Sequence, residues 1–265
     1  MKAMVLAAGL GSRLRPLTDD RPKALVEVAG RTMLDLTLAR LRHYGIREVI
    51  VNTHHFADMV ADYLGANQNF GMNIVVSREE VLLDTGGGLK QAAWFFEDAA
   101  DAPFLLHNVD VLSNIDFDAM LRHHTEHNAL ATLATQHRKT SRYLLFDDEG
   151  LLCGRQTVRK PGEPEPAELV REVAQPEPLA FGGIHVISPR IFGKIEEQGV
   201  FSIIAAYLKL AAEGERILAF NADEYQWRDL GTPASIDLAR QDLDDSGSAP
   251  HGLWSWYGGG DDDSR

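Results

Sequence analysis

Four cationic side chains lie close together near the start of this chain. Arg13, Arg15, Arg21 and Lys23 all belong to the segment LAAGLGSRLRPLTDDRPKAL at 6–25, although the chain as a whole carries a formal net charge of −13. Cations grouped in this way can neutralise several phosphate groups of one ligand. The segment is therefore predicted to hold a triphosphate, with Arg15 and Arg21 either taking part or remaining as solvated loop charges.

The strand predicted at Met4–Ala8 leads into a loop that contains Gly9 and Gly11. Glycine adopts φ values that a side chain forbids, and its N–H group can approach phosphate oxygens closely. A strand-to-helix turn in any α/β protein could use the same glycines. Leu14 stands where a dinucleotide-binding fingerprint has its third glycine, and no GKS or GKT follows, so the segment is neither that fingerprint nor a P-loop.

Two aspartates are candidate ligands for a divalent cation. Asp110 follows a predicted buried strand at Pro103–His107, and ligands of open α/β sheets bind at the carboxyl ends of strands. Asp229, in the segment WRDLGTP, supplies a second carboxylate from far away in the sequence. Mg²⁺ binds oxygen ligands and usually keeps one or two carboxylates together with substrate phosphates and water. The alternative for Asp110 is a helix cap, a role that Asn114 or Asp116 could fill better by position.

Alternating strands and helices position these residues in the first half of the chain. Leu34, Leu38 and Leu41 share one face of the first helix, and Gly45 ends that helix. The alternation predicts an α/β fold with a doubly wound, mostly parallel, Rossmann-like mixed sheet flanked by helices. The predicted strands are Met4–Ala8, Glu48–Asn52, Asn73–Ser77 and Pro103–His107, and the predicted helices are Met33–Tyr44, Phe56–Leu64, 89–97 and Phe117–Asn128.

The second half of the chain is predicted to be richer in strands. Residues 160–178 contain five prolines and predict a mobile loop rather than a core element. We expect one domain at 1–243, with halves at 1–128 and 129–243, and a flexible tail at 244–265. The predicted elements are strands at 129–137, 142–146, 151–158, 179–187, 216–221 and 225–229 and a helix at 203–212.

The segment at 6–25 closely resembles the signature of the sugar-1-phosphate nucleotidyltransferases, also called NDP-sugar pyrophosphorylases, which reads roughly LAAGxGxRxxPLTxxxPKxL. The resemblance covers nearly all of 1–240 and includes DTGGG at 84–88, similar to a base-recognition loop, and FGGIHVI at 181–187, similar to a sugar-contacting strand. It implies a glycosyltransferase-A-like nucleotidyltransferase domain at 1–243, with a nucleotide-binding half at 1–128 and a sugar-binding half at 129–243. The loop predicted at 160–178 would be either a flap over the sugar or an ordinary surface insertion. The signature is met by Leu6, Ala7, Ala8, Gly9, Gly11, Arg13, Pro16, Leu17, Thr18, Pro22, Lys23 and Leu25.

The resemblance also implies roles for particular residues. Asp110 and Asp229 would hold a catalytic Mg²⁺, Arg13 would stabilise charge on the leaving phosphates, and Lys23 would hold the α-phosphate or the sugar phosphate. No protein base is needed, because the phosphate of a sugar 1-phosphate is already largely a dianion at neutral pH. The nucleotide-binding residues would be Leu6, Ala7, Ala8, Gly9, Gly11, Ser12, Arg13, Thr85, Gly86, Gly87 and Asn108, and the sugar phosphate would contact Lys23, Gly182, Gly183 and Asp229.

The substrates are less closely defined than the reaction. Val109 stands where the family commonly has a glycine before the metal aspartate, and a branched side chain there could reshape the ribose or sugar contact. The compact length and the DTGGG segment look most like uridylyltransferases that act on N-acetylmuramic acid 1-phosphate, which would serve cell-wall synthesis. Mannose 1-phosphate guanylyltransferases are the alternative. A catalytically silent regulatory protein that binds a sugar nucleotide is a further alternative. The retention of Arg13, Lys23, Asp110 and Asp229 argues against it, because such a protein could lose any of these four residues.

Composition narrows the class of protein further. Cys153 is the single cysteine, which excludes an internal disulfide. The acidic charge disfavours nucleic acid as a partner, and the sequence shows no signal peptide and no apolar run long enough to span a membrane. His123 and His127 have the spacing of a zinc pair, but neither an HExxH motif nor a third ligand is evident. We therefore expect a cytoplasmic enzyme, either a monomer or a homodimer, that needs Mg²⁺ as its cofactor.

Overall fold

The computed structural model describes residues 1–99, 101–160 and 163–245. The chain divides into two compact units whose segments interleave in the sequence. The N-terminal unit comprises Ala3–Leu82, Asn108–Ile115 and the chain from Tyr225 onward, and the central unit comprises Met1–Lys2, Leu83–His107 and Asp116–Glu224. The boundary expected at residue 128 concerns function, and it stays a prediction.

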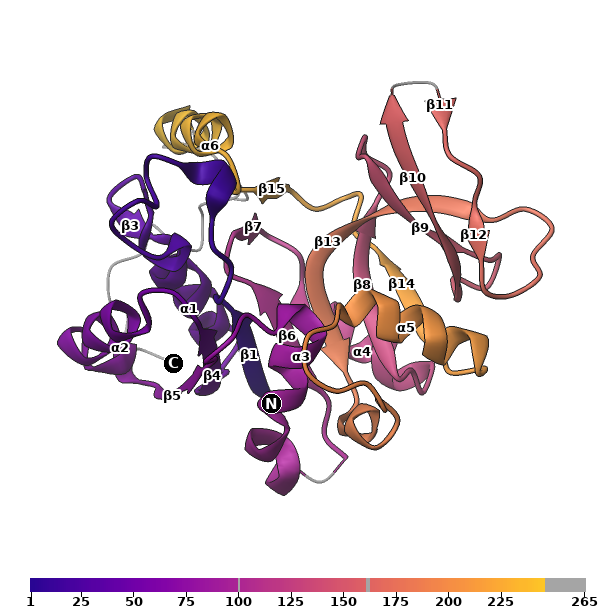
Figure 1. The fold of residues 1–265 in the computed structure, drawn as a ribbon, viewed down its shortest axis with the longest axis horizontal. Helices are drawn as coiled ribbons and strands as arrows, with labels where there is room; N and C mark the ends of the chain where they lie inside the picture. Colours follow the sequence, from indigo (N-terminus) through magenta and orange to yellow (C-terminus); the bar gives the residue numbers. More distant parts are fainter. Residues whose placement is uncertain (100, 161–162, 246–265) are drawn as a thin grey trace. The chain divides into compact units, whose positions relative to one another are not determined.

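In the N-terminal unit, strands β1 (Lys2–Leu6), β4 (Glu48–Thr53) and β5 (Asn73–Arg78) lie in that order in the sheet (Figure 1). β4 and β5 are parallel, with Glu48 opposite Asn73, and helix α2 (Ala57–Ala66) connects them. This is the strand and helix alternation that the sequence predicts. The other elements of this unit are η1 (Ser12–Leu14), η2 (Lys23–Leu25), β2 (Glu27–Val28), β3 (Arg31–Thr32), α1 (Met33–His43), η3 (Gln68–Gly71), β7 (Val111–Ser113), β15 (Trp227–Asp229) and α6 (Pro233–Asp245).

Helix α1 forms where the leucine spacing predicts it. Thr32 caps its first turn: the hydroxyl oxygen of Thr32 accepts a hydrogen bond from the backbone N–H of Asp35, the third residue of the helix. Leu34, Leu38 and Leu41 are fully buried. Gly45, with φ of +70°, takes the left-handed conformation that commonly follows the end of a helix.

Strand β1 ends two residues earlier than predicted. The predicted strand runs to Ala8, whereas β1 ends at Leu6. The N–H of Ala7 donates to Oδ1 of Asn52 over 2.7 Å instead of joining a strand ladder. The side chain of Asn52, on β4, therefore binds the backbone where the chain leaves the sheet.

The central unit is built on a mixed sheet. Strand β13 (Glu177–Ile187) runs antiparallel to β6 (Phe104–Asn108), β8 (Ala131–Gln136) and β9 (Arg142–Phe146), whereas β14 (Ile217–Asn221) is parallel to β8. The α/β class is confirmed. The remaining elements of this unit are α3 (Asp84–Gln91), η4 (Ala93–Ala99), α4 (Phe117–Glu126), β10 (Leu152–Lys160), β11 (Glu163–Pro164), β12 (Glu168–Leu169), η5 (Pro189–Gly193) and α5 (Ile203–Ala212).

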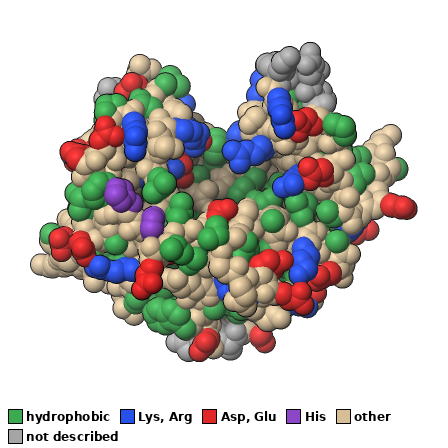
Figure 2. Space-filling model, viewed as in Figure 1, with side chains coloured by type: hydrophobic (Ala, Val, Ile, Leu, Met, Phe, Trp, Pro, Cys, Tyr) green, Lys and Arg blue, Asp and Glu red, His purple; other side chains and the backbone are tan. Residues whose placement is uncertain are grey.

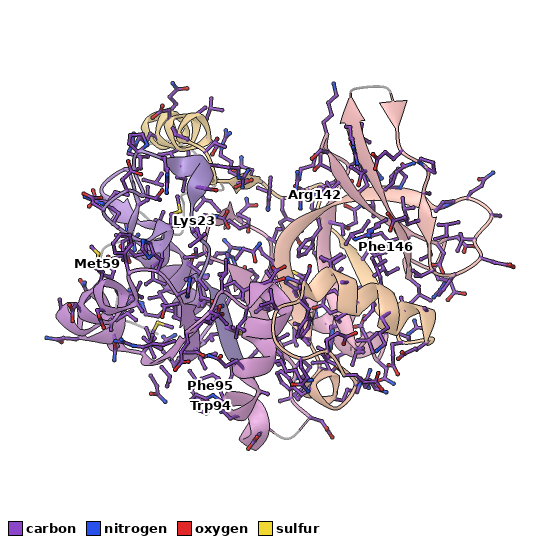
Figure 3. All side chains as sticks on the ribbon, viewed as in Figure 1. Lys23, Met59, Trp94, Phe95, Arg142 and Phe146 are labelled. Atoms are coloured by element: carbon purple, nitrogen blue, oxygen red, sulfur yellow. The ribbon has the colours of Figure 1, made fainter. Side chains whose placement is uncertain are left out.

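Side chains on β9 show how this sheet buries one end of a strand. Arg142 is exposed at its first position and Phe146 is buried at its last, and both are labelled in Figure 3.

Phe104 on β6 stacks with Phe96 and Phe192, at ring-centroid distances of 4.0 and 5.7 Å. Phe96 and Phe104 are buried, and burial of aromatic rings contributes to the stability of this unit.

Two further predicted elements differ from the structure. The region 160–178, expected to be a loop, contains the short strands β11 and β12, and both pair antiparallel with β10 because its outer edge leaves backbone groups to satisfy. The strand expected to complete the main sheet at 225–229 instead forms β15, which pairs only with β7 in a separate two-stranded sheet. Residues 161–162, and 246–265 of the predicted tail, lie outside the described residues.

His137 connects three segments of the central unit. Its Nδ1 lies 2.5 Å from an oxygen of Asp223, and its Nε2 lies 2.8 Å from an oxygen of Glu177. The hydrogen bonds to Asp223 and then to Glu177 raise the pKa of His137 above its ordinary 6.5. The imidazole therefore joins the chain after β8, the start of β13 and the chain after β14.

None of the described helices is long and apolar enough to cross a membrane.

We expect His137→Gln to destabilise the protein in a pH-dependent way. A raised pKa in the folded state gives a stabilisation that is complete below about pH 6.5 and is lost as the pH rises through the folded-state pKa. The melting temperature of the variant should therefore fall below that of the wild type by more at about pH 5.5 than at about pH 9. His55→Gln, at an exposed histidine, is the control. A difference that stays constant with pH would show that protonation of His137 contributes nothing.

Candidate functional site

The signature segment folds back on itself at Gly11. This residue has φ of +64°, and a Cβ there would lie 2.9 Å from Cγ2 of Thr18 and 3.1 Å from Cβ of Lys23. The hydroxyl of Thr18 donates to the carbonyl oxygen of Gly11 over 2.9 Å. Glycine is thus needed both for its conformation and for the close approach of the PLT and PK parts of the signature. This turn therefore brings Lys23 next to the glycine loop.

The first residues of the segment are held tightly, and the chain then opens. Ala7 and Ala8 are buried, and the carbonyl oxygen of Leu6 accepts a hydrogen bond from the N–H of Val109 over 3.1 Å. Gly9 is exposed, and a Cβ there would meet no atom within 4 Å. The backbone around Gly9 is therefore accessible to a ligand, as the prediction of a phosphate-binding loop requires.

Lys23 forms an ion pair with Asp110. Both side chains are about 15% exposed, and Nζ of Lys23 is in direct contact with Oδ2 of Asp110. Lys23 is labelled in Figure 3, in the segment that follows β1. Asp110 lies between β6 and β7, and the predicted alternative as a helix cap does not apply, because Asp116 caps helix α4.

The pairing of β7 with β15 brings Asp229 to the same place. Asp229 lies opposite Val111 in the register, and the N–H of Leu230 donates to the carbonyl oxygen of Asp110 over 2.8 Å. Nη2 of Arg13 lies 3.8 Å from Oδ2 of Asp229. The four residues predicted to be catalytic therefore lie in one unit as two cation–carboxylate pairs.

Gly231 allows Arg13 and Asp229 to approach each other. A Cβ at this position would lie 2.6 Å from Nη2 of Arg13 and 2.6 Å from Oδ1 of Asp229. Its N–H also donates to that oxygen over 2.6 Å. Sequence reasoning assigned no role to Gly231, and its place in the segment WRDLGTP was the available signal.

The donor set fits Mg²⁺. Asp110, directly before β7, and Asp229, at the end of β15, supply carboxylate oxygen atoms, while substrate phosphates and water usually complete the coordination of this ion. Among the residues that the structure describes, no group of three or more His, Cys, Asp and Glu side chains is arranged to hold a metal. Asp110 and Asp229 are thus suited to a cation that arrives with phosphate oxygens, and a zinc site would require more protein ligands.

The two other arginines of the segment pair with nearby acids. Nε of Arg15 lies 3.4 Å from Asp19, Nε of Arg21 lies 2.9 Å from Asp20, and all four side chains are largely exposed. Basic and acidic side chains are interspersed over the face shown in Figure 2. The neighbouring carboxylates balance the charges of Arg15 and Arg21, which favours the alternative that these arginines are solvated loop charges.

The DTGGG segment is a helix and not the predicted loop. Residues 84–88 form the start of α3, and the N–H groups of Gly86 and Gly87 donate to the carbonyl oxygen of Phe201 over 2.9 and 3.2 Å. A Cβ at Gly86 would collide with the ring of Phe201, and one at Gly87 would collide with the carbonyl oxygen of Gly199. These glycines therefore allow close packing of the chain near α5, and their amides already have acceptors.

The other residues predicted to bind ligands are in defined positions. In the central unit, Thr85 accepts a hydrogen bond from the N–H of Ile203 over 3.0 Å. Gly182 lies in β13 beside Gly183, whose φ of +75° accompanies a shift in the register between β13 and β8. In the N-terminal unit, Ser12 begins η1, Asn108 ends β6, and the side chain of Val109 is 2% exposed. The expected effect of Val109 on specificity stays a prediction.

Comparison with known proteins identifies the family. The family model described as Nucleotidyl transferase matches residues 2–246. The chain belongs to the nucleotidyl transferase family. The family predicted from the signature segment is therefore confirmed, and with it the prediction of a sugar-1-phosphate nucleotidyltransferase.

Two curated relatives show which members of the family this chain is similar to. It is 35% identical over 242 residues to the N-acetylmuramate alpha-1-phosphate uridylyltransferase of Caulobacter vibrioides, covering 87% of this chain and 92% of the relative. It is 32% identical over 241 residues to the protein of the same name from Neisseria meningitidis serogroup B, covering 91% and 97%.

A solved structure supports the fold. A putative glucose-1-phosphate thymidylyltransferase from Bacillus anthracis matches with a TM-score of 0.71 and 21% identity, and the match covers 91% of this chain and 94% of that one. The nucleotidyltransferase fold predicted from the sequence is confirmed.

We expect Gly231→Ala to lower turnover while leaving stability nearly unchanged. The new methyl group would push the flexible end of Arg13 away from Asp229, and a displacement of about 1 Å in an active site can cost up to about 10²-fold in rate. Pyrophosphate release and the melting temperature would be measured together. Gly65→Ala is the matched control, because a Cβ at that helical position meets no atom within 4 Å. Normal turnover of Gly231→Ala would show that the Arg13–Asp229 pair has no role in the reaction.

Proposed function

We propose that this nucleotidyltransferase joins UTP to N-acetylmuramic acid 1-phosphate, giving the UDP-sugar and pyrophosphate. The two relatives above, which carry this activity in their names, support the choice of substrates. The observation that carries the proposal is the pair of contacts between cations of the signature segment and the two candidate metal ligands, Lys23 with Asp110 and Arg13 with Asp229. We further propose that the enzyme acts in the cytoplasm and depends on Mg²⁺.

The residues of the N-terminal unit would serve alignment and charge neutralisation. The sugar phosphate is already largely a dianion at neutral pH, so its oxygen attacks the α-phosphorus without a protein base. Lys23 would hold the α-phosphate or the incoming phosphate, which lowers the repulsion between the two anions. Arg13 would stabilise the charge that develops on the leaving pyrophosphate. The exposed backbone at Gly9 and the turn at Gly11 would lie against the phosphates.

Asp110 and Asp229 would hold the magnesium ion. When bound, Mg²⁺ supplies positive charge to phosphate oxygens and keeps the reacting groups in register. The two carboxylates are already next to cations in this structure, so their negative charge is balanced before any ligand binds. Arg13 and Lys23 would then be free to turn toward phosphate oxygens.

Residues of the central unit would recognise the base and the sugar. We propose Thr85, Gly86 and Gly87 for the base, and Gly182 and Gly183 for the sugar, on the family resemblance of their segments. Because the amides of Gly86 and Gly87 already donate to Phe201, recognition by this segment would use other atoms than those two N–H groups. Nucleic acid is not among the proposed partners.

The substrate pair can be tested directly. We expect one strongly preferred combination, UTP with N-acetylmuramic acid 1-phosphate, when pyrophosphate release is measured over UTP, GTP, CTP and dTTP against several sugar 1-phosphates. The sugars should include N-acetylmuramic acid, N-acetylglucosamine, glucose and mannose. Preference for GTP with mannose 1-phosphate would replace the proposed pair with the guanylyltransferase alternative. Binding of nucleotide without any release of pyrophosphate would instead favour the regulatory alternative.

The proposed metal ligand gives a second test. Asp110→Asn removes a charge but keeps the size of the side chain, so we expect turnover to fall by about 10²-fold or more, as for the loss of one electrostatic contact in an active site. Binding of Mn²⁺ with UTP, followed by electron paramagnetic resonance, should weaken in parallel. Asp116→Asn is the matched control, because asparagine caps a helix as well as aspartate does. Full turnover of Asp110→Asn would contradict the metal assignment.

A further inference from the structure

A buried hydrogen-bond chain reaches the start of the signature segment from the neighbouring strands. The N–H of Ala7 donates to Oδ1 of Asn52 over 2.7 Å, and Nδ2 of Asn52 donates to Oε1 of Glu79 over 2.6 Å. Asn52 is 2% exposed and Glu79 is 4% exposed. Asn52 lies on β4, and Glu79 directly follows β5. These hydrogen bonds therefore link the carboxyl ends of the adjacent strands β1, β4 and β5.

Glu79 determines which way the amide of Asn52 points. A carboxylate accepts hydrogen bonds, so it faces the NH₂ group of the amide and leaves the carbonyl oxygen directed at the N–H of Ala7. Glu79 is itself held by its backbone, because its N–H donates to the carbonyl oxygen of Thr53 over 2.7 Å and its carbonyl oxygen lies 2.9 Å from Nδ1 of His54. The orientation of the amide is thus defined at both ends.

Ala7 is the residue of the candidate site that this hydrogen-bond chain reaches. Its N–H would otherwise be a buried donor without a sheet partner, since β1 ends at Leu6. The carbonyl oxygen of Leu6 accepts from the N–H of Val109, next to Asp110. The peptide group between Leu6 and Ala7 is therefore held on one side by the segment that carries Asp110 and on the other by Asn52.

We infer that Asn52, oriented by Glu79, is a positioning residue for nucleotidyl transfer: it holds Ala7 so that the glycine loop leaves β1 in the conformation that receives the triphosphate. Neither residue is among those proposed to bind the substrates. Their effect would pass through the backbone of Ala7 and Ala8 to the exposed position of Gly9. The inference rests on nucleotidyl transfer by this chain and does not depend on which base or sugar it uses.

An exchange of the two functional groups tests the inference. In Asn52→Asp, two carboxylates would face each other in a buried place, which disfavours the contact and disturbs the acceptor for Ala7. In the double variant Asn52→Asp with Glu79→Gln, position 52 regains an acceptor for the N–H of Ala7 and position 79 provides the donor. The total charge of the pair is the same as in the wild type. Val51→Ala, at a fully buried neighbour on β4, is the control for lost stability alone.

We expect the single variant to lose on the order of 10²-fold in kcat/KM for the nucleotide and the double variant to recover most of it. The assay would use whichever substrate pair the wild type turns over. Val51→Ala should lower the melting temperature without a comparable loss of kcat/KM. A double variant that stays as inactive as the single one, or a Val51→Ala loss of kcat/KM that matches the Asn52→Asp loss, would overturn the inference.

Hydrogen exchange provides a second readout that needs no substrate. The amide of Ala7 should exchange faster in Asn52→Asp than in the wild type and return to slow exchange in the double variant, while amides of α1 remain unchanged. Unchanged exchange at Ala7 in the single variant would show that Asn52 does not hold this amide. A wild type without turnover would contradict the proposed function and leave this measurement as a separate test of the hydrogen-bond chain.

Discussion

The antiparallel pairing of β7 with β15 brings together two carboxylates that lie far apart in the sequence. Asp110 and Asp229 would repel each other if no positive charge lay nearby, and the structure places one cation against each. Both cations, Arg13 and Lys23, come from the signature segment. The two aspartates and the basic segment therefore stabilise each other electrostatically, and their charges are balanced before a ligand binds.

Small residues allow this arrangement for steric reasons that differ between positions. Gly11 needs a positive φ and also a close approach to the side chain of Lys23. Gly231 needs only space, because a methyl group would fill the position of the Arg13 guanidinium. In the central unit, Gly86 and Gly87 provide space for a backbone carbonyl and an aromatic ring. The same residue type thus serves charge placement in one unit and helix packing in the other.

The proposed chemistry follows from groups that neutralise and align, without a protein acid or base. Lys23 and Arg13 are basic side chains, so they suit a reaction between two anions. The backbone at Gly9 is open, whereas Ala7 is held by Asn52. A fixed entry followed by an accessible turn is the arrangement that a preorganised phosphate-binding loop requires.

The sequence by itself determined the family, the α/β class, most helices and strands, and the four candidate catalytic residues, because local patterns such as the leucine spacing of α1 and the signature at 6–25 act over short distances. Tertiary structure decided that β15 pairs with β7, that residues 84–88 are helical, and that Asn52 and Glu79 hold Ala7. These features arise from contacts between segments distant in the sequence. A strand pattern does not specify its partner, and a buried amide is oriented only by the groups that surround it.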